Sequence, residues 1–530
     1  MGHRATWLAV LSLSSVGCLS NTNNPPPSDD SGAFEFDAGM ADFDTGTPDT
    51  STPPQPDATV IEAGTPDAGV ADSSPPIVTV DAADAGPAPV SLVVLGPSGL
   101  PEANVGVVFS DASGAVLSFA TTPATGTLTE VLAPGSQVTV LFGTASSPTL
   151  LTIVGVQPGD KLTAIDTSSA PAEVAQPVAV GGLSTSFPDG GADFAVTAGA
   201  CGIGDDQSFP GAAFDFTITN GCESAGKFPL LATATDANGS PLAFTFLKGT
   251  AIATDGGFDD AGNQDVSMAS APAWAPTVSL IVSDTNVPAQ IFPGITFNEV
   301  AGGVSSSSFA SELEDLGNGV QSTTFATHPG YADFVQMETS YFPPSTTNGD
   351  SQGSPFVAIA TRTSPSSPTT AFDLSTAPPA LTSSVVDYAN VAQPSLGWTS
   401  AAPITTAAGS ILNLTWSTDS ETSVVGSWTF VAPATTTLLQ APALPTQVAA
   451  WAPVQGASFG IPTVVLFWGT FWSGYDEFRS TSATVTSGQV NALFACVESD
   501  GSETAPGCIP PLPANGTVQI STFYQQAFVE

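Results

Sequence analysis

Residues 99–140 read GLPEANVGVVFSDASGAVLSFATTPATGTLTEVLAPGSQVTV. Short apolar runs rich in Val, Thr and Phe alternate here with turn sequences such as Asp111-Ala112-Ser113-Gly114 and Pro134-Gly135. β-Branched and aromatic residues favour strands, whereas Gly, Pro, Asp and Ser favour the turns between them. The stretch therefore predicts short antiparallel strands joined by tight turns.

The same pattern extends to both sides of this stretch. It predicts strands at Ser91–Leu95, Asn104–Ser110, Ala115–Ala120, Thr127–Leu132, Gln137–Phe142, Leu150–Val156 and Lys161–Ile165. Short strands at such regular spacing, with a turn signal between each pair, are typical of a β-sandwich. We therefore expect a first domain at residues 90–166.

Three phrases of this segment occur in a familiar order. A Pro–small–Val–hydrophobic strand runs from Pro101 to Val108, a D-x-x-G turn from Asp111 to Gly114, and a T-x-x-x-G sequence from Thr122 to Gly126. In these features, residues 88–166 resemble carboxypeptidase regulatory-like domains, which have a transthyretin-type β-sandwich. The resemblance implies a module that is generally non-catalytic.

Two further β-rich regions are expected, at 172–293 and 295–530, the second holding one domain or two. Strand patterns in the second region are Ala179–Phe187, Ala192–Thr197, Ala213–Thr219, Leu230–Thr235, Leu242–Leu247 and Thr277–Ser283. Those in the third region are Gln321–Ala326, Asp333–Phe342, Ile411–Ser417, Ser427–Val431 and Val464–Trp468. Asn238-Gly239 predicts a hairpin turn, because both residues tolerate a positive φ. The fold class predicted from the whole chain is all-β, with two or three sandwich-like domains.

One helix is expected, at Ser308–Leu316. Phe309, Leu313 and Leu316 would lie on one face of such a helix, and Gly317 follows it as a terminator.

Composition excludes several classes of function. The chain of 530 residues has 48 Asp+Glu against 6 Lys+Arg, a net charge of −42. That charge repels a phosphate backbone, so we expect no nucleic-acid partner. A hydrophobic fraction of 42% excludes disorder of the whole chain.

The first residues are typical of a secretory signal. His3 and Arg4 precede an apolar stretch from Trp7 to Val16, which is too short to span a bilayer as a helix. The ending Ser15-Val16-Gly17-Cys18 resembles a bacterial lipobox, although Ser15 stands where Leu is usual. The resemblance implies that residues 1–17 are removed and that Cys18 carries a lipid such as palmitate. Leu19 in place of Asp favours the outer membrane; the alternative is ordinary signal cleavage with Cys18 incidental.

Residues 18–89 are expected to form the lipidated cysteine and a disordered, acidic, Pro-rich tether. From residue 19 to residue 89 the chain has 13 acidic residues, 12 prolines and no Lys or Arg. Such a composition cannot bury enough apolar surface to offset the entropy lost on ordering. A cation-binding or glycosylated stalk is the alternative interpretation.

The remaining cysteines form two pairs that are local in the sequence. They are Cys201, Cys222, Cys496 and Cys508. An even number of cysteines in an exported chain indicates disulfides, and four cysteines allow three pairings. Cys201–Cys222 with Cys496–Cys508 is the simplest. A zinc site is disfavoured, because the chain has no C-x-x-C and only one His after residue 3.

Two segments are candidate binding sites. The first is an aromatic segment that contains Trp468, Phe471, Trp472 and Tyr475; exposed coplanar rings of this kind stack on sugars, so a glycan is a candidate partner. The apolar run just before it favours core packing instead. The second is an Asp-rich loop with Asp255, Asp259, Asp260, Asn263 and Asp265. Its oxygens suit calcium, the one cofactor considered, although an acidic solvated loop explains them equally.

Catalytic motifs are weak. Gly456-Ala457-Ser458-Phe459-Gly460 matches G-x-S-x-G, but Pro462 and a strand pattern follow it where a nucleophile elbow requires a helix. His328, beside Pro329, is the one histidine that could complete a triad. We therefore expect no enzyme, but a non-catalytic, outer-membrane-anchored lipoprotein whose β-domains serve extracellular binding or envelope structure. Its partners would be the membrane, through the lipid, and a glycan or a basic protein surface. The alternative is a secreted, glycosidase-like hydrolase that uses Asp/Glu pairs in the C-terminal region.

The lipid prediction is tested by metabolic labelling with a radioactive fatty acid. The wild-type protein should take up the label and Cys18→Ala should not, because only the thiol of residue 18 can carry the diacylglycerol group. Equal labelling of the two proteins, or none in either, contradicts the prediction.

Overall fold

The structure is a computed structural model. It describes residues 87–525, except for 97–99, 167–175, 182–188, 192, 199–213, 219–226, 252–263, 303, 345–352, 367, 369, 419–423, 461 and 482–514. The signal, Cys18 and the tether lie outside these residues. Among the described residues, no helix has the length and the apolar character needed to cross a membrane.

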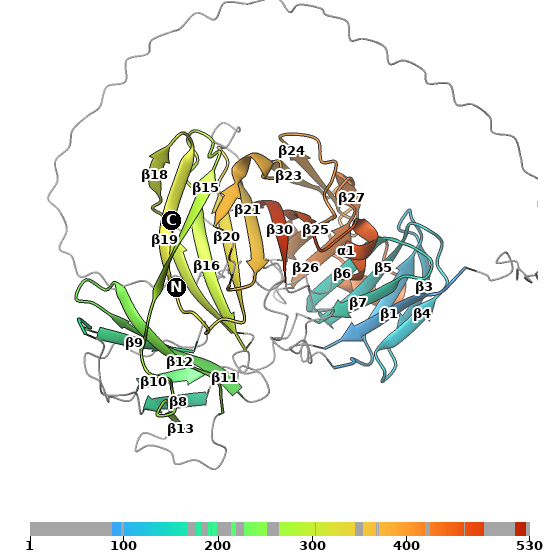
Figure 1. The fold of residues 1–530 in the computed structure, drawn as a ribbon. Coiled ribbons are helices and arrows are strands. Elements are labelled where there is room, and N and C mark those ends of the chain that lie inside the picture. Colours follow the sequence, from blue (N-terminus) through green and yellow to red (C-terminus); the bar gives the residue numbers. More distant parts are fainter. Residues whose placement is uncertain are drawn as a thin grey trace, which may run out of the picture. The chain divides into compact units, whose positions relative to one another are not determined.

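The all-β prediction is confirmed (Figure 1). In the described part of the chain, strands are joined by turns, and the one α-helix is α1 (Tyr475–Ser480). Two short 3-10 helices, η3 (Leu374–Thr376) and η4 (Thr446–Trp451), complete the helical content of that part.

The first region has all seven predicted strands. They are β1 (Val90–Leu95), β2 (Gly106–Ser110), β3 (Val116–Thr121), β4 (Thr127–Glu130), β5 (Ser136–Thr144), β6 (Ser147–Val156) and β7 (Lys161–Ile165). The β2–β3 turn forms as its sequence predicts. The Asp111 carboxylate accepts hydrogen bonds from the backbone N–H groups of Ser113 and Ala115, and Gly114 has φ +82°. Strands β4, β1 and β7 form one sheet, which packs against β2, β5 and β6.

The second region contains two small sheets. Their strands are β8 (Gln176–Gly181), β9 (Asp193–Thr197), β10 (Phe214–Ile218), β11 (Lys227–Thr235), β12 (Pro241–Ala251), β13 (Gln264–Ser267) and β14 (Ala275–Pro276). The sheet orders are β10-β8-β13 and β14-β12-β11-β9. The predicted Asn238-Gly239 hairpin turn joins β11 to β12, with Gly239 at φ +80°.

Most of the third region, together with residues Val278–Thr285 from the end of the predicted second region, is a β-sandwich of one small and one large sheet. The small sheet has the order β18-β19-β15-β22, from β18 (Glu314–Gly317), β19 (Val320–Thr327), β15 (Val278–Thr285) and β22 (Ala371–Asp373). Facing it are β16 (Gly294–Ala301), β17 (Val304–Ala310), β20 (Phe334–Tyr341) and β21 (Gly353–Thr363). Their inward residues, such as Phe297, Met337 and Ile359, pack on Val282 and Phe325 in one core.

The large sheet has thirteen strands and joins the first region to the third. Its order is β17-β16-β20-β21-β30-β29-β25-β26-β6-β5-β2-β3, with β28 paired to β25. The strands not yet introduced are β25 (Gly409–Ser417), β26 (Val425–Ala432), β28 (Ser458–Phe459), β29 (Thr463–Gly469) and β30 (Gly516–Gln525). The last strand, β30, pairs with β21 on one side and with β29 on the other. Figure 1 shows it in red beside β21. A further sheet, β23 (Leu381–Asp387), β24 (Ser395–Ser400) and β27 (Leu438–Gln440), has the order β23-β24-β27.

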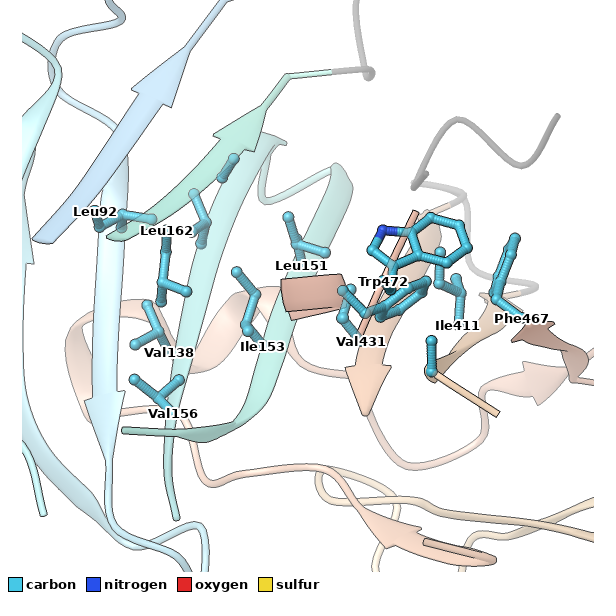
Figure 2. Packing of buried hydrophobic residues seen from close by; sticks show 14 of the residues in the cluster. Leu92, Val138, Leu151, Ile153, Val156, Leu162, Ile411, Val431, Phe467 and Trp472 are labelled. Atoms are coloured by element: carbon cyan, nitrogen blue, oxygen red, sulfur yellow. The ribbon is translucent and has the colours of Figure 1, made fainter. Parts of the chain in front are cut away.

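One hydrophobic core crosses this junction. Leu92, Val138 and Ile153 of the first region belong to the same cluster as Val431 and Trp472 of the third (Figure 2). Strand β26 pairs with β6 in parallel, with Ser427 opposite Thr149 and Val431 opposite Ile153. The residues at 90–166 therefore share both a sheet and a core with residues far along the chain.

The predicted helix at Ser308–Leu316 is wrong. Residues 304–310 form strand β17, paired with β16, and residues 314–317 form β18. Phe309 and Leu316 are both more than half exposed. The run of serines has low helix propensity, and the open edge of β16 offers its backbone a full set of hydrogen bonds, so tertiary pairing overrides a weak helical pattern.

A carboxyl group lies in the sandwich core. Asp284 of β15 is 0% exposed, and its Oδ2 accepts a hydrogen bond from the Thr339 hydroxyl at 2.9 Å. Its Oδ1 has no hydrogen-bond partner among the described residues. Burial raises the pKa of Asp284 to about 6, because a charged carboxylate is poorly solvated there.

We predict that Asp284→Asn stabilises the protein at neutral pH. The folded-state pKa is about 6 and the ordinary value is 3.8, so ionisation costs folding free energy as the pH rises through this window. The amide keeps the Thr339 contact and carries no charge; the gain should reach about 1–3 kcal/mol at pH 8 and vanish below pH 4. Urea midpoints at the two pH values measure it.

The matched control is Glu312→Gln, since Glu312 is exposed. Removal of this surface charge should change the midpoint little at either pH. A stability gain for Asp284→Asn that is equal at pH 4 and pH 8 contradicts the burial explanation.

Candidate functional site

The candidate site is built on the turn between β19 and β20. The Tyr331 N–H donates to the His328 carbonyl at 3.0 Å, which closes a four-residue turn. Pro329 and Gly330 occupy its central positions, and Gly330 has φ +85°. Proline followed by a residue with positive φ is the arrangement of a type II turn, so the His-Pro-Gly sequence itself places His328 at the strand end.

Glu299 faces this turn from strand β16. In the inward-facing row Ile295, Phe297, Glu299 and Ala301, it is the one charged residue, and it is 4% exposed. A buried carboxylate requires hydrogen-bond donors, since an uncompensated charge in an apolar core is costly. His328 supplies these donors.

The Glu299 carboxylate binds His328 twice. Its Oε1 accepts from the His328 backbone N–H at 2.9 Å, and its Oε2 lies 2.5 Å from Nδ1. The backbone contact and the ring contact together hold the imidazole against this one side chain. The orientation of the imidazole ring is therefore determined by one carboxylate.

The other side of the ring meets the second β-region. Nε2 lies 3.4 Å from the Thr233 hydroxyl of β11, and Phe244 of β12 contacts the ring edge at a centroid distance of 5.0 Å. Tyr331 makes a second edge contact at 6.3 Å. Tyr331 is 0% exposed, and burial, with the nearby Glu299 and Asp333 charges, raises the pKa of its hydroxyl.

An ion pair adjoins this group. Lys248 Nζ lies 2.8 Å from Asp333 Oδ1, and Asp333 Oδ2 accepts from the Gly302 N–H at 2.8 Å. Lys248 belongs to β12, whereas Asp333 directly precedes β20. Both carboxylates of the site thus have a donor, and Lys248 offsets one of their charges.

A cavity of about 680 Å³ opens beside these groups, and we name it the His328 cavity. It lies at one end of the sandwich, between β15 and β16. Its apolar wall includes Val278, Leu280 and Phe297, and its polar wall includes Glu299, His328 and Asp333, with Ser364 and Ser366 at a loop. Cavities of this size and mixed lining hold small molecules. Chemically, the lining presents carboxylate, imidazole and hydroxyl groups toward a mostly apolar space.

The aromatic segment is arranged differently from a stacking surface. Phe471 is 8% exposed and Trp472 is 6% exposed, and both belong to the core that crosses the junction (Figure 2). Tyr475 is half-buried against this same core, and Trp468 is half-buried against a second hydrophobic cluster, which contains Trp428 and Phe430. A ring inside a core cannot stack on a sugar, so for Phe471 and Trp472 the binding interpretation is corrected to core packing, in line with the apolar run before them.

The G-x-S-x-G serine and the histidine lie on different elements. Ser458 is on β28, which pairs with β25, and His328 follows β19. The polar atoms bound to the His328 ring are those of Glu299 and Thr233.

The remaining predicted residues receive no structural description. Cys201, Cys222, Cys496 and Cys508 lie outside the described residues, as do Asp255, Asp259, Asp260 and Asn263. Asp265 lies on β13, of which only the backbone is described. The two disulfides and the calcium loop remain predictions.

Sequence reasoning treated His328 as a loop residue and did not connect it to Glu299. A signal existed, because the row Ile295-x-Phe297-x-Glu299-x-Ala301 places an acid where alternation predicts an apolar residue. Such a residue needs a buried donor. The chain has 2 His and 6 Lys+Arg, so the choice of donors was narrow.

Comparisons with known proteins show little. No protein-family model and no curated protein matches the chain. Among solved structures, it is similar to BcpA, the major pilin subunit of Bacillus cereus, with 10% identity and a TM-score of 0.13 over 54% of this chain and 98% of that one. It is also similar to native E. coli alpha-2-macroglobulin, with 11% identity and a TM-score of 0.10 over 70% of this chain and 26% of that one.

We predict that Glu299→Ala destabilises the protein by about 2–4 kcal/mol, because it leaves two donors of His328 buried without an acceptor. Guanidinium midpoints measure the loss. The matched control is Tyr331→Phe at the same site. The Tyr331 hydroxyl has no hydrogen-bond partner among the described residues, so its removal should cost less than about 0.5 kcal/mol. Equal losses in the two variants contradict the assigned role of Glu299.

Proposed function

We propose that the protein is a non-catalytic lipoprotein, anchored to the outer membrane through Cys18, that binds a neutral glycan in the His328 cavity. The lipid anchor follows from the lipobox-like ending of the signal. The Pro-rich acidic tether that we expect after Cys18 would carry the β-body away from the membrane. We further propose that residues 88–166 are a carboxypeptidase regulatory-like module; their seven strands and their Asp111–Gly114 turn support this.

The observation that carries the binding proposal is the lining of the cavity. Glu299 and His328 hold each other in one geometry, so the polar wall needs no rearrangement when a ligand arrives. Carboxylate oxygens retain further acceptor capacity, and sugar hydroxyls are donors that match it. Val278 and Leu280, which are not fully buried, offer an apolar surface to the C–H face of a sugar ring.

Charge argues for a neutral ligand. The chain carries −42 overall, which disfavours the approach of an anion. Within the site, the Lys248 ion pair offsets the charge of Asp333, and both Glu299 oxygens are engaged by His328, so the site offers no free carboxylate to attract a cation. A volume of about 680 Å³ is ample for one or two sugar units.

The predicted outcome of a glycan-array screen is binding to a small set of neutral glycans that is lost in Val278→Trp. Val278 is 51% exposed and lines the cavity, so an indole there fills the entrance without disturbing the core. Affinity should fall at least tenfold, by array titration and by calorimetry with the best glycan.

Ile281→Trp is the matched control. Ile281 is on the same strand, β15, is 62% exposed, and does not line the cavity. Binding should persist in this variant. Equal loss in both variants, or no glycan bound by the wild type, contradicts the proposed site, and turnover of a glycoside by the wild type contradicts the non-catalytic assignment.

A further inference from the structure

In the sheet formed by β3, β2, β5 and β6, the strands β2, β5 and β6 are mostly buried on both faces, whereas the edge strand β3 is exposed or half-buried. Along β5, every residue from Ser136 to Phe142 is buried, without the alternation that a half-solvated strand shows. Val138 and Val140 face the β4-β1-β7 sheet, as part of the core that crosses the junction. Thr139 and Leu141 point to the opposite face and are 0% and 3% exposed. A sandwich that folds by itself would leave that second face to water.

The second face is covered by residues from much later in the chain. Val108, Leu141 and Leu150 belong to one cluster with residues of the third region. Those residues include Trp398, Trp428, Phe430, Leu439 and Ala441. The backbone contributes as well, since the Ala443 N–H donates to the Gly114 carbonyl at 2.9 Å.

The edge of this sheet is closed by strand β26. Its register with β6 is parallel, from Ser427 opposite Thr149 to Val431 opposite Ile153. Two buried hydrogen bonds between side chains reinforce this pairing. The indole Nε1 of Trp428 donates to the Thr152 hydroxyl at 2.8 Å, and the hydroxyls of Thr152 and Thr139 are hydrogen-bonded at 2.8 Å. Trp428 is 0% exposed. Without β26, an apolar edge and two buried hydroxyls would face solvent.

Helix α1 adds polar side-chain contacts to the end of β6. Arg479 is 1% exposed; its guanidinium donates to the Gly155 carbonyl at 2.8 Å and to Asp160 at 3.0 Å. The Tyr475 hydroxyl contacts the carbonyls of Val154 and Val431, and so spans the β6–β26 junction. These bonds join the end of β6 to a segment more than three hundred residues later in the sequence.

We propose that residues 87–166 are an incomplete β-module whose open edge and second face recognise β26 and the strands around it. The partner is this chain's own segment from β23 to α1, in particular Val425–Ala432. The two parts stay bound to each other when the chain between them is cut. If Cys18 carries the proposed lipid, this association would hold the rest of the β-domains at the membrane after proteolysis of the connecting chain.

The test uses the whole mature chain with Cys18→Ala, so that it does not depend on the lipid. A recognition sequence for a specific protease is inserted between Asp166 and Gln176, after β7, and the folded protein is cut there. The two pieces should co-elute in size-exclusion chromatography at micromolar concentration and at the mass of one chain. They should separate only in denaturant.

Arg479→Met in the same cut protein should speed the release of the N-terminal piece at least tenfold, because one side of a buried charged contact is removed. Lys248→Met is the matched control: its ion pair joins the second and third regions and does not touch residues 87–166, so release should not change. The uncut variants are first compared by thermal melting to confirm that each is folded.

Three results overturn the proposal. The first is separation of the two pieces in native buffer, or cooperative melting of the N-terminal piece by itself at the temperature of the intact chain. Equal release rates in Arg479→Met and Lys248→Met would exclude the junction as the source of the association. Elution of the cut protein at the mass of two chains would show that the strand comes from a second copy.

Discussion

The parallel pairing of β6 with β26 is the contact on which the rest of the structure depends. It joins the four strands β6, β5, β2 and β3 near the start of the described chain to the strands that run from β26 to β17, and so produces a single sheet of thirteen strands. Parallel strands cannot be joined by a tight turn, so this contact needs a long connection. The chain supplies it as two hundred and more residues that build the other sheets. The entropy of closing so long a loop must be offset by packing, and the aromatic cluster around Trp428 is placed where that packing is needed.

Several of the few basic groups of this acidic chain lie at contacts between its β-regions. Arg479 binds Asp160 across the β6–β26 junction, and His328 binds Glu299 beside the second β-region. Arg362 is 1% exposed with its guanidinium 3.3 Å above the Phe334 ring, and burial lowers its pKa to about 10. With 48 acidic residues to 6 Lys+Arg, a buried carboxylate has few cations to draw on. Glu299 therefore relies on the one histidine that lies within reach.

The local sequence was sufficient to predict those elements whose conformation depends on interactions between neighbouring residues. The Asp111 and Asp236 turns form as expected, since each carboxylate accepts from the backbone N–H two residues on and the glycine that follows takes a positive φ. Strands with alternating or apolar runs, such as Lys161–Ile165, were predicted to the residue. The failure at residues 308–316 has the opposite cause. Residues up to 310 pair with β16, and residues from 314 pair with β19, and local periodicity does not encode either pairing.

The candidate site shows the same division. His328 and Glu299 are both evident in the sequence, but 29 residues separate them, and nothing in the spacing brings them together. The sandwich does so, because it sets β16 beside the turn that follows β19. The aromatic segment was evident too, yet whether its rings are exposed depends on what covers them. Phe471 and Trp472 belong to the core that crosses the junction, where Trp472 packs against Phe467 and Phe478.

The sequence by itself determined the all-β class, the turns and most of the strands, because these follow from side-chain period and from the backbone preferences of Gly, Pro and Asp. Only the tertiary structure decided which strands are neighbours, which aromatic rings are core and which acid meets the histidine. Those outcomes depend on contacts between residues that lie from 29 to more than 300 positions apart. The physical reason is that a buried face or a buried charge is stable only when a particular distant partner covers it.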